Sequence, residues 1–553
     1  MKRAKIQSLI LNRLRIKSTK IRLAKKYTSI LKKYIRIYKI IKSQKQYYQS
    51  DTRPNINGNS NGNVLIISST LGNLRISQID ILIKRMLDEN SIKSKIHFCG
   101  GMLPICSLCE EEKIDQNVLD SKNYSCTSCN LFDSKAIKVE KNFGLIEDSV
   151  AFNDYNGYNN DINQFVDNFK SSKKEELYKN INIHEHASST LARYYGRSID
   201  KIDVLKNKEY NSIYLKCLIS ACTVAEYWHN RFGVGDIESI ILNHGLYIPQ
   251  GVILEVARFY GIRVSTWHLG YRKGTILVAT GDTYHKTLLD PIKNDRTAEA
   301  LSEDKKSEIL RYLKSRRTGN QDQISFVYYS DEEDKALLKK INESTKNAFN
   351  FIVALNVSWD AQSHYKDNIY DSMEEWIAEL IEIAKSFEGK ANFIFRCHPA
   401  EVTGRRISRF PTSRFILDRI SSSNNIYVIN ADDKISTYDL IDYCDAGIIY
   451  ASKVGVEIAC SGKELIICGE SCLRNKDIGR EVKHKSDLHF HIEDIVSGSR
   501  LIDKEKALKY AYHLFFKEMM SWNRLSNKDD SSSDYQVITK LLGENAIPQT
   551  TNV

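Results

Sequence analysis

The stretch Asn392–Pro399, "NFIFRCHP", is a short apolar run that ends in an arginine, a cysteine, a histidine and a proline. Such a run predicts a buried strand with polar side chains at its carboxyl end. Similar runs surround it, separated by helical patterns: "FIVALNV" (Phe351–Val357), "IYVI" (Ile426–Ile429), "AGIIY" (Ala446–Tyr450) and "LIICG" (Leu465–Gly469). Short strands that alternate with helices predict a parallel sheet of the Rossmann type.

The first half of the chain repeats this alternation. Its apolar runs are "VLIISS" (Val64–Ser69), "KIHFC" (Lys95–Cys99), "SIILNHG" (Ser239–Gly245) and "IRVSTWH" (Ile262–His268). We therefore expect an α/β fold with two Rossmann-like domains facing a cleft. The expected boundaries are 64–320 for the first domain and 321–525 for the second, followed by a polar tail over 526–553.

Positive charge is concentrated at the amino-terminal end of the sequence. Residues 1–50 hold sixteen Lys and Arg and no Asp or Glu, so removing them from the net charge of +11 leaves about −5 for the rest. Apolar residues recur between these cations over residues 1–48, which favours a basic amphipathic helix on an anionic membrane surface. The alternatives are a helix packed on the body of the protein and, more weakly, an RNA-binding arm. Residues 51–63 are then a polar linker.

Four cysteines form two Cys-x-x-Cys pairs, Cys106 with Cys109 and Cys126 with Cys129, sixteen residues apart. Four thiolates at this spacing predict a closed, structural zinc site inserted at about 99–130 in the first domain. Cys99 is a spare thiol, and free thiols or an iron–sulfur cluster are the alternatives. The acidic segment between the pairs disfavours a nucleic-acid reader. No secretory signal or long apolar run is visible, so we expect a cytoplasmic protein on the inner face of the membrane.

The polar residues that follow the later strands are candidates for an anion site. Ser436 and Thr437 open one predicted helix, and Ser452 and Gly455 open another, where backbone N–H groups would receive a phosphate. Glu457 lies one turn further and would accept hydrogen bonds from a ribose diol; the alternative is a local ion pair with lysine. Both segments belong beyond the carboxyl ends of their strands, where ligands of doubly wound sheets bind.

The ordered set "NVSWDAQ", "WIAELIEIAKSF", "FRCHPAE" and "STYDLIDYCDAGIIYASKVGVEIACSGKELIICGE" resembles the capsule and surface polysaccharide biosynthesis glycosyltransferases of the GT-B fold. The resemblance covers about 356–469 and extends more weakly to 245–275. It implies that Arg396 and His398, with Glu401 in the same motif, contact the phosphates or sugar of a nucleotide-activated donor. A turn-capping role is the structural alternative for a histidine or arginine at a strand end.

The catalytic base would lie on the acceptor side of the cleft, in the first domain. The candidates are His285 and Asp282 in "TGDTYHK" and His244 in "NHGLY", with the group His184, Glu185 and His186 as further possibilities. A retaining enzyme of this fold needs no dedicated base. No catalytic metal is expected, because no Asp-x-Asp pair stands at a predicted strand end.

The resemblance thus implies a glycosyltransferase, and the basic arm predicts that it is peripheral on the membrane. It would move a sugar from a nucleotide-sugar donor to a growing capsule or surface polysaccharide, or to a lipid-linked acceptor. The alternatives are a glycerophosphotransferase or nucleotide-sugar epimerase of the same fold, and a non-catalytic zinc-containing nucleic-acid or scaffold protein. No nucleic acid is expected as a partner, because the basic charge is confined to the arm.

Overall fold

The computed structural model describes most of the two expected domains. The described residues are 63–69, 74–99, 103–106, 160–199, 201–289, 300–325, 348–360, 367–403, 408–420, 423–526 and 531–544, with isolated residues between 332 and 346. The basic arm, nearly all of the linker, and Cys109, Cys126 and Cys129 lie outside them. Within these ranges, no helix has the length and apolar character needed to cross a bilayer.

The first sheet has six strands in the order β12-β5-β4-β3-β1-β2. The strands are β1 (Val64–Ser68), β2 (Ser94–Phe98), β3 (Ser239–Asn243), β4 (Arg263–Leu269), β5 (Thr275–Thr280) and β12 (Met519–Ser521). β1 to β4 are parallel, whereas β5 runs antiparallel to β4 and β12 runs antiparallel to β5. The carboxyl ends of β1 to β4 therefore lie at one edge of the sheet.

The second sheet is entirely parallel, in the order β11-β10-β9-β6-β7-β8. Its strands are β6 (Phe349–Ala354), β7 (Ala391–Arg396), β8 (Ile426–Ile429), β9 (Ala446–Ile449), β10 (Glu464–Ile467) and β11 (Arg480–Glu481). The order reverses between β6 and β9, which places a ligand crevice beyond their carboxyl ends. The expected α/β fold with two Rossmann-like domains is confirmed.

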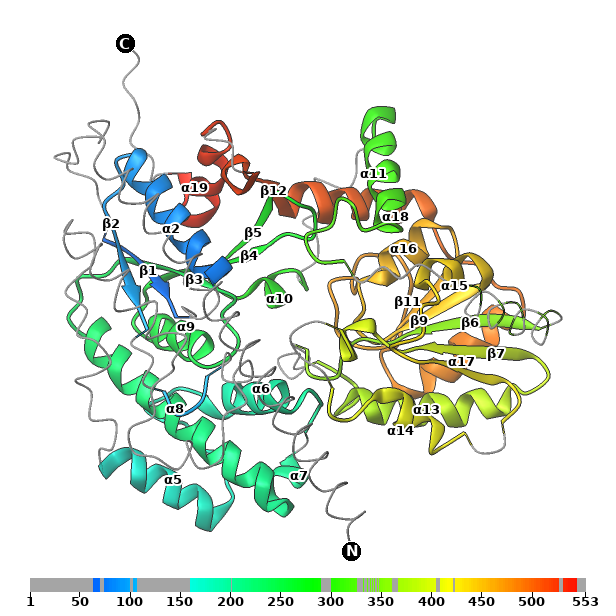
Figure 1. The fold of residues 1–553 in the computed structure, drawn as a ribbon, viewed down its shortest axis with the longest axis horizontal. Coiled ribbons are helices and arrows are strands. Elements are labelled where there is room, and N and C mark those ends of the chain that lie inside the picture. Colours follow the sequence, from blue (N-terminus) through cyan, green and yellow to red (C-terminus); the bar gives the residue numbers. More distant parts are fainter. Residues whose placement is uncertain are drawn as a thin grey trace, which may run out of the picture.

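Helices cover both faces of each sheet (Figure 1). In the second lobe, one face of the sheet shares a core with α13 (Met373–Ser386) and α17 (Lys485–Val496). The other face shares a core with α15 (Thr437–Tyr443), α16 (Val454–Cys460) and α18 (Lys504–Tyr512). Alternate residues supply the two cores, since Phe351 and Val353 face α13 whereas Ile352 faces α16. This explains why the strands of this lobe are continuous apolar runs.

The remaining helices lie mainly in the first lobe. Between β2 and β3 they are α5 (Asn160–Ser172), α6 (Ile183–Tyr195), α7 (Lys201–Lys206) and α8 (Lys208–Phe232). Beside the first sheet are α2 (Leu74–Glu89), α9 (Gln250–Phe259) and α10 (Tyr284–Thr287). The junction and the second lobe contain α11 (Glu303–Arg316), the 3₁₀ turn η4 (Pro399–Glu401) and α14 (Thr412–Leu417). α5, α6, α8 and α9 build one continuous apolar core with β1, β3 and β4.

The end of the chain crosses back from the second lobe to the first. After α18, a π-helical turn η5 (His513–Glu518) leads into β12, a 3₁₀ turn η6 (Asn523–Ser526) and α19 (Asp534–Leu542). α19 buries Val537, Ile538 and Leu541 against the first sheet. The expected loose tail from residue 526 thus contains an ordered helix, because this apolar face follows the polar stretch that suggested a tail.

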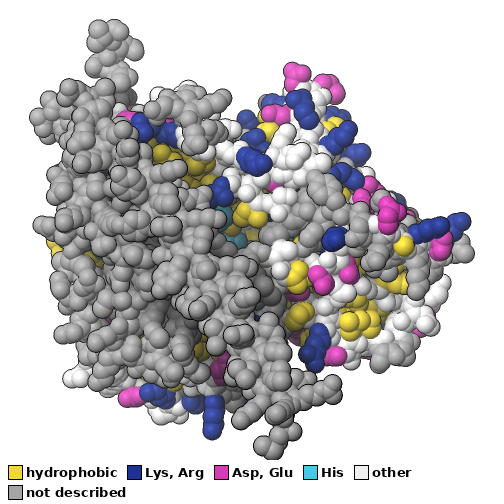
Figure 2. Space-filling view, in the orientation of Figure 1, with side chains coloured by type: hydrophobic (Ala, Val, Ile, Leu, Met, Phe, Trp, Pro, Cys, Tyr) yellow, Lys and Arg dark blue, Asp and Glu magenta, His cyan; other side chains and the backbone are white. Residues whose placement is uncertain are grey.

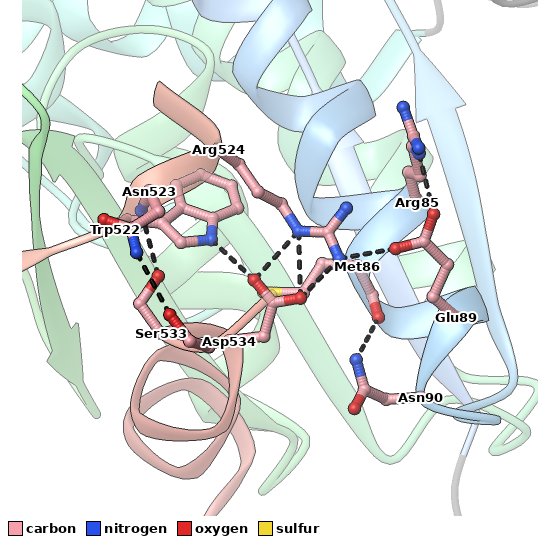
Figure 3. Close-up of polar contacts among 10 residues, drawn as sticks. Arg85, Met86, Glu89, Asn90, Trp522, Asn523, Arg524, Ser533 and Asp534 are labelled. Carbon is pink, nitrogen blue, oxygen red and sulfur yellow. Dashed lines mark hydrogen bonds and ion pairs between the residues drawn. The ribbon is translucent and has the colours of Figure 1, made fainter. Parts of the chain in front are cut away.

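A buried ion pair fixes this returning segment (Figure 3). Arg524 donates to both carboxylate oxygens of Asp534, which also accepts from the indole N–H of Trp522 at 3.0 Å. Arg524 reaches Glu89 of α2 as well, at 2.5 Å. The side chains of Arg524 and Asp534 are only 5% and 2% exposed, so the pair is shielded from screening by solvent and salt.

Replacing Arg524 with methionine should lower the free energy of unfolding by about 3–5 kcal/mol, because Asp534 is left as an uncompensated buried charge. Urea unfolding followed by tryptophan fluorescence measures this loss. The control is Lys170→Met in the exposed pair with Asp167, where the loss should stay below about 1 kcal/mol. Equal losses in the two variants would show that the Arg524 pair does not anchor the segment.

Candidate functional site

Side chains from both lobes converge between the two sheets, where Figure 2 shows histidine and apolar side chains at the bottom of a hollow. His398 follows β7, Asp360 follows β6, and Lys453 lies between β9 and α16. From the first lobe come His268, near the carboxyl end of β4, and Tyr271 just after it. Lys453 and Asp360 act electrostatically on both histidines, so the four groups lie within reach of one another's charge.

His398 is held as a neutral ring with a defined tautomer. Its Nδ1 accepts the backbone N–H of Ala400 at 3.0 Å, so the neutral imidazole carries its proton on Nε2. Burial lowers the pKa of His398 to about 4, and the positive charges of Lys453 and Arg396 add to this against the opposing charge of Asp360. At neutral pH the ring is an uncharged hydrogen-bond donor.

His268 has the opposite tautomer. Its Nδ1 lies 2.8 Å from the carbonyl oxygen of Leu269. A carbonyl can only accept, so Nδ1 carries the proton and Nε2 is left as an acceptor. Burial lowers the pKa of His268 below its usual value, assisted by Lys453 and opposed by Asp360. The two histidines thus offer one donor and one acceptor.

Lys453 crosses between the lobes. Its ammonium nitrogen lies 3.4 Å from the centroid of the Tyr271 ring, a close cation–π contact. Burial lowers the pKa of Lys453 to about 8, and the charge of Arg316 contributes, while Glu457, Asp360 and Asp322 oppose the shift. The lysine is therefore largely protonated at neutral pH but close to its titration.

Two of the predicted donor contacts, Arg396 and Glu401, have partners within the protein. Arg396 donates to the backbone carbonyls of Asn430 and Asp433, and its residue is 2% exposed. Glu401 accepts from both the backbone N–H and the hydroxyl of Thr412. These contacts fix the loops after β7 and β8. For Glu401 we therefore expect a structural role, whereas the donor role of Arg396 stays a prediction.

Glu457 is paired with Arg316, not with the lysine considered as its alternative partner. Arg316, at the end of α11, donates to one Glu457 carboxylate oxygen at 2.5 Å and also contacts Asp322 at 3.3 Å. The other carboxylate oxygen of Glu457 is buried without a hydrogen-bond partner among the described residues.

Both predicted helix starts are present, and different local contacts shape each of them. Ser436 caps α15 by accepting the N–H of Tyr438 at 3.2 Å, and Thr437 is the first residue of that helix. Ser452 is buried just before α16. At Gly455 an added Cβ would lie 2.6 Å from Ile449 and 2.7 Å from Leu473. The glycine thus lets α16 lie close to Ile449 of β9 and to Leu473. Its role in phosphate approach stays a prediction.

The predicted bases of the first lobe separate into two groups. The ring of His244 lies 5.3 Å from that of His285 and 5.2 Å from that of His268, so both predicted histidines border the cluster. Asp282 instead pairs with Arg258 at 3.1 Å, and its second oxygen accepts the N–H of Thr283. The carboxylate of Asp282 therefore already has two partners outside the cluster.

The further possibilities in α6 serve packing. His184 contacts the hydroxyl of Tyr214 at 2.9 Å, and His186 donates to the carbonyl of Leu246 at 2.7 Å. An added Cβ at Gly251 would lie only 2.2 Å from the His186 ring, which shows how closely α9 packs there. Glu185 lies 4.0 Å from Lys286.

Sequence reasoning missed His268, Tyr271, Asp360, Lys453 and Arg316. Three of them stand in motifs that were singled out: His268 in "IRVSTWH", Asp360 in "NVSWDAQ" and Lys453 in "SKVGVE". All three follow or end apolar runs, which is the signal that could have found them. Arg316 carries no such signal, because it lies in a charged helix 141 residues before its partner.

The predicted metal ligands lie mostly outside the described residues. Cys106 is partly buried beside the core of α5, α6 and α8. Cys109, Cys126 and Cys129 are not described. In the part of the chain that is described, no cluster of three or more His, Cys, Asp or Glu is arranged to bind a metal ion.

Neither a protein-family model nor a curated protein matches the chain. Several solved structures are similar to it. KpsC from Thermosulfurimonas dismutans, a β-Kdo 2,4 transferase, has 14% identity, covers 50% of this chain and 79% of its own, and has a TM-score of 0.32. UDP-GlcNAc 2-epimerase from Neisseria meningitidis bound to UDP-GlcNAc has 11% identity and a TM-score of 0.27. The match covers 81% of this chain and 97% of the epimerase.

A third similar structure is the glycosyltransferase SnogD from Streptomyces nogalater, with 10% identity and a TM-score of 0.24. The match covers 82% of this chain and 96% of SnogD. Similarities this distant do not choose between transfer and epimerisation. The function must therefore be argued from the chain's own residues.

Replacing Glu401 with glutamine should lower the free energy of unfolding by about 1–3 kcal/mol, because one of the groups bound to the buried carboxylate loses its acceptor. Nucleotide affinity should stay within about twofold, since the side chain serves the loop. Thermal unfolding and titration calorimetry with nucleoside mono- and diphosphates measure the two effects. Weaker nucleotide binding with unchanged stability would instead support a donor contact for Glu401.

Proposed function

We propose that the protein is a glycosyltransferase of the GT-B type, which moves a sugar from a nucleotide-activated donor to a growing capsule or surface polysaccharide or a lipid-linked acceptor. The donor would lie against the second lobe and the acceptor against the first. The observation that carries the proposal is the pair of neutral histidines with opposite tautomers, His398 and His268, contributed by different lobes and influenced by the same lysine and aspartate.

The two tautomers match the two charges that develop during sugar transfer. The leaving nucleotide gains negative charge on its phosphate oxygen, which the Nε2–H of His398 and the ammonium of Lys453 can stabilise. The attacking acceptor hydroxyl loses a proton, which the unprotonated Nε2 of His268 can accept as a general base. We therefore assign the base to His268, with the predicted His244 and His285 as its neighbours.

The polar groups at the second-lobe helix starts complete the donor site in this proposal. Ser436, Thr437 and Ser452 would contact the nucleotide, and the unpartnered oxygen of Glu457 would accept from the ribose. The basic arm, residues 1–48, would hold the enzyme on an anionic membrane surface, where lipid-linked acceptors are found. An epimerase or glycerophosphotransferase would use the same donor site with a different product.

Replacing His268 with alanine should lower kcat/KM for sugar transfer by about 10²–10⁴-fold, the usual contribution of a general base. His398→Ala should lower it by about 10²–10³-fold, the usual cost of losing a donor to developing charge. Product analysis with UDP-, GDP- and CMP-linked sugars and a saccharide acceptor measures both. His489→Ala, at an exposed position on α17, is the control and should retain full activity.

The pH profile separates a base from a structural residue. Transfer by the natural protein should fall as pH decreases through the pKa of His268, which burial holds below the usual 6.5, because only the neutral ring accepts a proton. That acid limb should disappear in His268→Ala. Donor conversion without any acceptor would identify an epimerase, and retention of full transfer in both histidine variants would refute the proposed roles.

We further propose that Cys106, Cys109, Cys126 and Cys129 bind one structural zinc ion, since four thiolates leave no open coordination position. Metal analysis of the purified protein should find about one equivalent of zinc, and Cys109→Ser should lose it. Cys472→Ser, in a partly buried thiol of the second lobe, is the control and should retain the metal. A metal content well below one equivalent would remove the assignment.

A further inference from the structure

The cation–π contact between Lys453 and Tyr271 joins the two lobes at the candidate site. Lys453 precedes α16 of the second lobe, and Tyr271 follows β4 of the first. The backbone N–H of Tyr271 lies 3.3 Å from the sulfur of Met519 in β12, so the ring stands where the returning chain rejoins the first sheet. The lysine therefore reaches from its own lobe onto a fixed part of the other.

The ammonium group of Lys453 has no carboxylate within ion-pair distance among the described residues. Glu457 and Asp322, whose charges do reach it, are both bound to Arg316. The Tyr312 hydroxyl also donates to Asp322, at 2.8 Å. Arg316 already binds both of these carboxylates, so their charges act on Lys453 only from a distance, as that of Asp360 does, and the ring of Tyr271 is its close contact.

We propose that Lys453 is the residue that binds the phosphate of the donor, and that its contact with Tyr271 is a latch between the lobes that the bound phosphate releases. This inference rests on the proposed function and names the cation of that site. A charge-assisted hydrogen bond to phosphate is stronger than a partly exposed cation–π contact, so an arriving phosphate draws the ammonium away from the ring. Departure of the nucleotide returns it.

Another contact region between the lobes is formed by Arg197 over the Phe410 ring at 4.6 Å and by Arg409 over the Tyr194 ring at 5.3 Å. It contains no member of the cleft cluster, so it can persist when phosphate binds. Release of Lys453 would therefore loosen the lobes at the site while the helical side of the first lobe stays in contact.

The test uses the full chain and measures the affinities of inorganic pyrophosphate, nucleoside diphosphates and the matching nucleosides. Lys453→Met should weaken binding of the phosphate-containing probes by about 10–100-fold, the usual range for a hydrogen bond to a charged group, and leave nucleoside affinity unchanged. Lys453→Arg keeps the charge and should bind within about threefold of the natural protein.

The latch itself is tested on the aromatic partner. Tyr271→Leu removes the ring and should tighten phosphate binding by about two- to fivefold, since no cation–π contact has to be broken. Tyr271→Phe keeps the ring and should bind as the natural protein does. If the leucine and phenylalanine variants bind equally, there is no latch.

The pH dependence supplies a second readout. Burial lowers the pKa of Lys453 to about 8. The charge of Arg316 on α11 adds to this shift, whereas Glu457 of α16, Asp360 after β6 and Asp322 oppose it. His398 and His268 also face the lysine, and both are neutral in this range because their pKa values are lowered. Phosphate affinity should therefore fall as pH rises above about 8, and this fall should be absent in Lys453→Arg, which stays charged.

The outcomes distinguish this inference from the proposed function. Equal pyrophosphate binding by Lys453→Met and the natural protein would overturn the inference while leaving sugar transfer possible. Lysine-dependent pyrophosphate binding without turnover of any nucleotide sugar would support the inference and refute the proposed function. If the natural protein binds neither pyrophosphate nor nucleotides, both fall.

Discussion

The parallel arrangement of strands is the constraint on which the candidate site depends. Parallel strands place all their carboxyl ends at one edge of the sheet, so the loops after β6, β7 and β9 must emerge side by side. This is why Asp360, His398 and Lys453, which are far apart in sequence, lie within reach of one another's charge. The first sheet contributes the end of β4 in the same way, and the returning chain through β12 ties the two sheets together.

Arg316 holds α11 in a fixed position. The residue is 7% exposed, and its guanidinium contacts Glu457 of α16 together with Asp322. A buried guanidinium must keep its carboxylates, since losing one partner leaves the other charge uncompensated. Arg316 therefore holds α11 against α16. Because the charge of Arg316 is already paired with two carboxylates, Lys453 is the cation that can bind a ligand.

The core strands of the fold could be predicted from the sequence because apolar runs of four to seven residues record burial on both faces. β12 could not, since a three-residue strand is recognised only by its pairing with β5, more than 230 residues earlier. α19 was hidden by the serines and aspartates before it. In both cases the deciding contact is made with a distant part of the chain.

The same distinction applies to the site. The predicted strand ends indicated where polar residues would gather. His398 belongs to the cluster, and His244 and His285 border it. Their partners could not be read locally: Thr412 binds Glu401, Arg258 binds Asp282, and Gly455 serves packing against Ile449. A residue type at a strand end identifies a position in the fold, whereas its hydrogen-bond partners determine whether it remains available for a ligand.

The charge states of the two histidines and of Lys453 have a consequence for binding. His398 and His268 are neutral and Lys453 is near its titration, because burial penalises each charged form. A phosphate placed beside Lys453 and His398 would raise the pKa of both groups, since it favours their protonated forms. The cleft would then take up protons as the donor binds and release them as the nucleotide leaves. A permanently charged arginine in place of Lys453 could bind the phosphate but could not make this exchange.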